Sequence, residues 1–137
     1  MSSIDDALVA RAAAFAGLTG LIGTQPDMRF YPADSAPPNA TRPYVGYQQI
    51  SPTDRAHAMG SDPGSVRARI QLTCWGDTST NCRDVCDQVR ACFSRIRGTI
   101  ASVVIDDIFV DNEHDLGRET ETRYYQRIID LIVWHRE

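Results

Sequence analysis

Four cysteines are the residues in this sequence whose chemistry most readily suggests a metal site or a nucleophile. They are Cys74, Cys82, Cys86 and Cys92, with seven, three and five residues between successive members. Structural zinc sites usually carry two tight cysteine pairs, with about two to four residues inside each pair. The last three cysteines also fall on the apolar stripe of a helix that we predict to start near residues 78–80 and to end before Gly98. Because cysteine packs there as a small hydrophobic residue, we expect reduced thiols in the core and no metal.

A second candidate site is a short acidic segment that contains a histidine. Asp111, Glu113, His114 and Asp115 place four potential metal ligands within five residues. Calcium loops space their oxygen ligands in a fixed rhythm, and that rhythm is absent here. The sequence therefore favours a solvated polar turn over residues 111–117.

A pair of glutamates close to the C-terminus could also do acid–base chemistry. Glu119 and Glu121 would share one face of a strand, as paired carboxylates do in glycosidases. Arg118 and Arg123 stand beside them, so a ladder of surface charges is the favoured interpretation.

The remaining reactive residues form no catalytic pattern. The three histidines, His57, His114 and His135, are scattered, and all 14 basic residues are arginine. The lack of lysine excludes a Walker-type phosphate site and a Schiff base. An enzyme that uses a metal or a cysteine, built on Cys82, Cys86 and His114, stays as an alternative. We expect a protein that is not an enzyme, with no catalytic residues and no cofactor.

The composition is that of one ordinary globular domain over residues 1–137, with 42% hydrophobic and 23% charged residues. The net charge of −4 argues against a dedicated nucleic-acid binder. The N-terminal residues are acidic where a signal peptide would be basic, and no apolar run reaches the roughly 20 residues of a membrane helix. We therefore expect a cytoplasmic site of synthesis and no membrane partner.

The elements that would position these residues can be read from their hydrophobic periods. An amphipathic helix is expected over residues 3–16, with one more buried turn at 18–22, before the helix that carries the cysteines. Strands are expected at 28–31, 44–50, 66–75, 100–110 and 122–135, with a bulge or break at Asp106 and Asp107. The resulting prediction is an α+β fold, with a mostly antiparallel sheet of four to five strands and two helices packed on one face.

Two stretches rich in proline or glycine have neither a helical nor a strand period. They are residues 32–43 and 51–65, and both are predicted to be long loops. The second contains His57 and Met59 and would suit an adaptable protein contact.

The expected last strand is too long for a domain of this size. A strand over residues 122–135 would span about 46 Å at roughly 3.3 Å per residue. A compact domain of this length has a diameter near 37 Å, taking a radius of gyration of roughly 14 Å. Both faces of the strand are apolar near its end, so a projecting end would need cover. The strand therefore favours an oligomer.

The order of motifs along the chain resembles that of the phage tail completion, or tail-terminator, family. After the first helix comes Arg29-Phe30-Tyr31-Pro32, then the segment at 42–48 that reads Arg-Pro-Tyr-Val-Gly-Tyr-Gln. The strand at 66–75 ends in Cys74-Trp75, a helix opens at Thr78, and the last strand closes with Ile132-Val133-Trp134. The resemblance covers nearly the whole chain, although the 51–65 segment and the cysteines have no counterpart in it.

The resemblance implies a structural protein of the virion tail or neck, assembled in the bacterial cytoplasm and found in phages, prophages and gene-transfer agents. Such proteins form a ring, usually a hexamer, that terminates the tail tube and joins the tail to the head or neck. The implied partners are other copies of the chain, the tail tube protein and a head or neck connector. DNA would pass through without specific binding, and a ring of this kind could use the edges of an open sheet. The alternative is a small non-viral protein-binding module that acts as a dimer.

Overall fold

The computed structural model describes residues 4–24, 28–32, 43–50, 54–55, 65–118 and 125–136. Within them lie three helices, α1 (Ile4–Ala14), α2 (Ala16–Ile22) and α3 (Ser79–Phe93). The strands are β1 (Phe30–Pro32), β2 (Tyr44–Gln49), β3 (Asp54–Arg55), β4 (Ser65–Gly76), β5 (Gly98–Ile100), β6 (Val103–Arg118) and β7 (Tyr125–Arg136).

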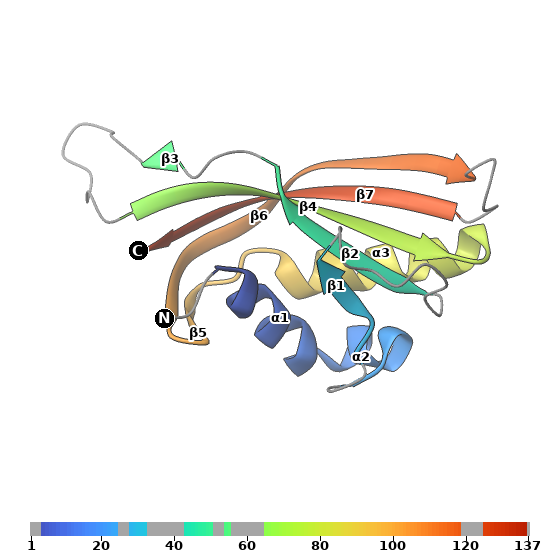
Figure 1. The fold of residues 1–137 in the computed structure, drawn as a ribbon, viewed down its shortest axis with the longest axis horizontal. Helices are drawn as coiled ribbons and strands as arrows, with labels where there is room; N and C mark the ends of the chain where they lie inside the picture. Colours follow the sequence, from blue (N-terminus) through green and yellow to red (C-terminus); the bar gives the residue numbers. More distant parts are fainter. Residues whose placement is uncertain are drawn as a thin grey trace.

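The strands form one mixed sheet in the order β1-β2-β4-β7-β6-β5, and β3 pairs with β4 beside it. The β1–β2 pair is parallel, and every other described pair is antiparallel. Figure 1 shows the three helices gathered on one face of this sheet, with α3 against β4, β6 and β7. The predicted α+β class is therefore confirmed. The predicted four to five strands and two helices are too few. Strands β3 and β5 are two and three residues long and carry almost no periodic signal, and α2 was expected only as an extra buried turn.

The core between sheet and helices follows the two clearest periods of the sequence. Along β4, alternate residues are buried under the helices: Ala68, Ile70, Leu72 and Cys74. On β7 the same face carries Ile129, Leu131 and Val133, each 0% exposed. The stripe of α3 packs onto them with Cys82, Val85, Cys86, Val89, Cys92 and Phe93. The helix starts where expected, because the Thr78 hydroxyl caps it by accepting a hydrogen bond from Asn81 N at 3.0 Å.

The N-terminal helical segment differs from its prediction in one respect. The chain breaks at Phe15, and α2 follows as a separate helix that buries Leu18 and Ile22. The expected extra turn is thus a helix of seven residues, which packs on both α1 and α3.

Strand β6 holds the main difference between expectation and structure. The bulge predicted at Asp106 is confirmed, since the β6–β7 register shifts between Ile105 and Asp107. The predicted polar turn over 111–117 is wrong, because these residues continue β6 through two further register shifts. At its beginning β6 turns back onto β5 through Ala101 and Ser102, and Figure 1 shows both strands curving toward α1. Bulges bend a strand, so they account for this curvature.

The last strand carries apolar residues on both faces, as expected. Ile132, whose side chain lies on the face away from the helices, is 2% exposed between its register partners Arg69 and Phe109. The described strand starts at Tyr125, so the expected residues 122–124 lie outside the described part. No helix of the described chain is both long and apolar enough to cross a membrane.

Candidate interaction surfaces

The acidic residues of β6 form ion pairs on opposite faces of the sheet. On the face away from the helices, Asp111 Oδ2 lies 2.8 Å from Arg69 Nη1. On the helical side, Glu113 lies 3.4 Å from Arg90 and 3.5 Å from Arg127. His114 Nε2 lies 2.8 Å from the side-chain amide of Asn112, and the Asp115 side chain is outside the described part. These predicted ligands therefore do not converge, and in the described ranges no three His, Cys, Asp or Glu side chains are grouped for a metal.

The four cysteines are free and buried, which confirms their predicted place in the core. The Cys82 thiol donates to the Cys74 carbonyl at 3.2 Å, and the Cys86 thiol donates to Glu113 Oε1 at 3.3 Å. The hydrogen bond with Cys86 and burial raise the pKa of the Cys74 thiol well above its usual range. Burial raises the pKa of Cys92 to about 11, although nearby Arg11 opposes the shift. Since the thiolate is the reactive form, these environments suit packing and not nucleophilic attack.

The other predicted site residues do not come together with them. His57 lies outside the described residues, as do Glu119, Glu121 and Arg123. His135 is 9% exposed near the end of β7. The expected 51–65 loop contains β3, whose backbone pairs with Arg67 and Val66 of β4.

No described helix covers the opposite face of the sheet (Figure 1); we call it the outer face. Its polar side chains pair within the chain: Arg69 also pairs with Asp130 at 3.2 Å, and Gln48 is hydrogen-bonded to Gln71 at 3.1 Å.

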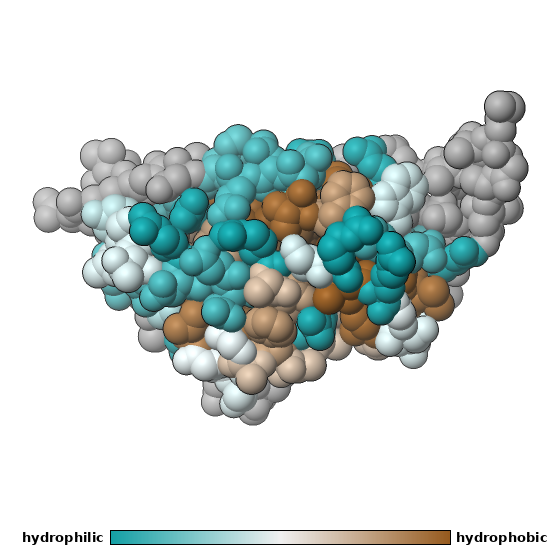
Figure 2. Space-filling view, turned by 180° about the vertical axis from the view of Figure 1, so that it is seen from behind, coloured by the Kyte–Doolittle hydropathy of each residue, from teal (hydrophilic) through white to brown (hydrophobic). Residues whose placement is uncertain are grey.

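One end of the outer face carries a row of half-buried aromatic rings, with Tyr44 stacked on Trp75 at 5.8 Å and Tyr31 5.9 Å from Tyr44. Among described residues the exposed large apolar side chains are Ile50 and Val104. Figure 2 looks at the molecule from behind Figure 1 and not onto the outer face; on this side too, apolar patches are broken up by hydrophilic groups.

The two edges of the sheet are poorly suited to adding a strand from another chain. The β1 edge is three residues long and ends at Pro32, which lacks an N–H donor. At the other side β5 covers only Val103–Ile105 of β6. The rest of β6 carries two further register shifts, and bulges of this kind protect an edge from pairing. The expectation that open sheet edges join the subunits stays a prediction.

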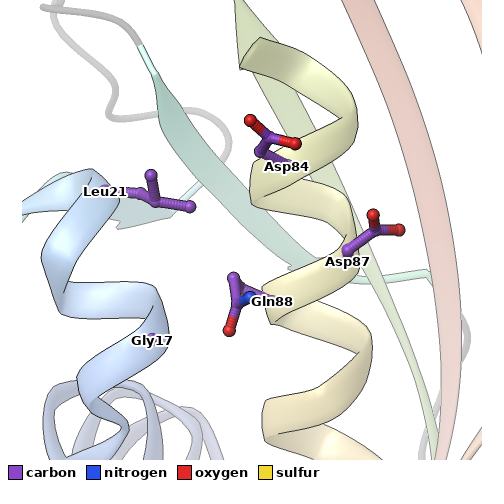
Figure 3. A pocket seen from close by; sticks show the side chains of 5 residues that line it. All are labelled: Gly17, Leu21, Asp84, Asp87 and Gln88. Carbon is purple, nitrogen blue, oxygen red and sulfur yellow. The ribbon is translucent and has the colours of Figure 1, made fainter. Parts of the chain in front are cut away.

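A groove of about 290 Å³ lies between α2 and α3. It is lined by Gly17 and Leu21 on α2 and by Asp84, Asp87 and Gln88 on α3 (Figure 3). A Cβ on Gly17 would meet the end of the Gln88 side chain, so the glycine leaves room for this flexible side chain beside α2. Leu21 gives the groove an apolar wall, and the two aspartates give it a negative rim. Sequence reasoning missed this groove, because the periodicity showed only that Asp87 faces away from the core and could not show which helix lies opposite.

The comparisons with known proteins give the family. A family model described as "Tail completion protein gp17" matches residues 6–136. A chain in the structure titled "Virion of native gene transfer agent (GTA) particle" has the same fold, with a TM-score of 0.70 and 14% sequence identity over 95% of this chain and 92% of that chain. The search of curated proteins finds no match. Because the family match spans nearly the whole chain and bears out the resemblance seen in the motifs, the chain belongs to the tail completion protein gp17 family.

Proposed function

We propose that this protein is a structural part of a virion that forms a ring on the finished tail tube and joins the tail to the head or neck. The observation that carries the proposal is the family match over residues 6–136, together with a fold shared along almost its full length with a chain of a gene-transfer-agent virion. A hexamer is the expected form of the ring.

The physical properties of the described surface are compatible with this role. The cysteines, histidines and carboxylates that could do chemistry are buried, ion-paired or apart from one another within the described part. A net charge of −4 suits a ring through which DNA passes, because each phosphate neutralised by a cation would add affinity and retard passage. The partners are then other copies of the chain, the tail tube protein and a head or neck connector.

The proposal is tested by adding the purified protein to purified tail tubes of the same particle. We expect one ring at one end of each tube, with six-fold symmetry in averaged end views and a mass of six chains in native mass spectrometry. Tubes that form without the protein should be uncapped and should fail to join heads. A chain that stays monomeric at high concentration and leaves tubes bare would contradict the proposal, and a stable dimer that ignores tubes would favour the non-viral binding module.

A further inference from the structure

The α2–α3 groove is a negatively charged, partly apolar binding surface on the helical layer. Asp84 is exposed and has no ion pair within the described ranges, while Asp87 pairs with Arg90 at 2.5 Å. Arg90 also lies 3.4 Å from Glu113, which Arg127 approaches as well, whereas none of the described cations pairs with Asp84. An arginine side chain fits such a groove, because its aliphatic stem can lie on Leu21 while its planar head bonds the carboxylates.

The turn between α3 and β5 carries an excess of positive charge. Arg95 Nη1 and Arg97 Nη2 approach the same oxygen, Asp107 Oδ2, at 2.9 and 4.0 Å. The two arginine side chains are 64% and 68% exposed, whereas the Asp107 side chain is 18% exposed. One carboxylate therefore faces two guanidinium groups, and Arg97, the more distant, is available to another partner.

These two surfaces lie toward opposite ends of the helical layer. In Figure 1, α2 lies near the N-terminal half of α3, and β5 follows the C-terminal end of α3 on the other side of the molecule. A groove and a turn placed in this way cannot meet within one chain, but they can meet between two copies arranged head to tail. A head-to-tail contact joins unlike surfaces, and it closes into a ring when the rotation between copies allows.

We propose that the α2–α3 groove of one copy receives the Arg97 side chain of the next copy, with Arg95 beside it, and that this contact joins the subunits of the ring. The inference rests on the proposed function and names the surface through which the ring is built. The argument from charge is strengthened by the sheet edges, because the short β1 edge and the bulged β6 edge leave little room for a continuous sheet between copies. Like other exposed ion pairs, the contact should weaken as salt concentration rises.

Charge reversal on the two sides gives a specific test. Asp84→Arg and Arg97→Asp each set like charges against one another, so each variant alone should associate about tenfold more weakly than the wild type, because such juxtaposition is repulsive. When the two variants are mixed in equal amounts, every groove can meet a turn of opposite charge. The mixture should therefore recover alternating rings, and the double variant in one chain should recover association as well.

The measurement is the oligomer mass, by native mass spectrometry and by sedimentation, with and without tail tubes. Arg83→Glu is the matched control, since Arg83 is exposed on α3 and does not line the groove; it should associate as the wild type does. Thermal unfolding of each variant checks that it is folded. Wild-type rings that are unaffected by Asp84→Arg, or a mixture that fails to recover them, would overturn this contact and leave the proposed function standing. A wild type that forms no ring, even on tubes, would overturn both.

Discussion

At the scale of single residues, the cysteines show how local surroundings suppress chemistry. All four are buried, and three of their thiols donate to a backbone carbonyl or a carboxylate. We predict that a disulfide reagent such as dithionitrobenzoate reacts with none of them within minutes in the native protein at pH 8, and with all four after unfolding in guanidinium chloride. A Thr99→Cys variant supplies the control, because residue 99 is exposed and its thiol should react at once. A native thiol that reacts as fast as this control would contradict the core assignment.

The same environment makes a prediction about alkaline pH. Burial raises the pKa of Cys92 to about 11, from an ordinary value of 9.0. Between these values the unfolded chain loses the proton while the folded chain keeps it, so unfolding becomes easier as pH rises. The stability that the Cys92 thiol contributes is thus fully present below pH 9 and is lost as pH rises toward 11. Urea unfolding at several pH values measures the slope.

A Cys92→Ala variant isolates the contribution of this thiol. Its stability is lower at every pH because the substitution leaves a cavity, but its decline between pH 9 and 11 should be shallower than that of the wild type. The slope is not abolished, since Cys74 shifts in the same direction. An unchanged slope in Cys92→Ala would show that Cys92 ionises equally in both states.

At the scale of elements, the sequence predicted what depends on local period and missed what depends on distant partners. The alternation of β4 and the stripe of α3 were predicted because burial on one face leaves a pattern in neighbouring residues. Strand β6 was predicted to stop at a polar turn because its second half is acidic and its register shifts break the alternation. The arginines that neutralise this acidity, Arg69, Arg90 and Arg127, come from β4, α3 and β7. No local pattern predicts pairing between elements that are distant in the sequence. The α2–α3 groove was missed for the same reason, because it is formed by two separate helices.

The junction between β4 and α3 supports a prediction about glycine. A Cβ on Gly76 would lie 2.6 Å from the backbone nitrogen of Cys82 and 2.9 Å from its Cα, so the start of α3 would have to shift. Gly76→Ala should therefore lower the free energy of unfolding by about 1–3 kcal/mol, as overpacking does. Gly20→Ala is the control, because it lies in α2 with no atom within 4 Å of the added Cβ. That variant should be unchanged or more stable by about 0.5–1 kcal/mol, since alanine is the better helix former. Chemical unfolding of both variants decides, and equal losses would contradict the steric argument.

At the scale of the whole molecule, a ring joined through the helical layer leaves the outer face of the sheet open to water. That face suits this position, because its ion pairs are satisfied within the chain and its aromatic rings are half buried by one another. Both tryptophans of the protein lie on it, Trp75 on β4 and Trp134 on β7. We therefore predict that ring formation leaves the tryptophan emission maximum and its quenching by acrylamide unchanged. Trp75→Phe and Trp134→Phe variants report each end of the face separately. If assembly protects either tryptophan strongly from acrylamide, the outer face takes part in the contact between copies, and the subunits cannot be joined by the groove and the Arg97 turn alone.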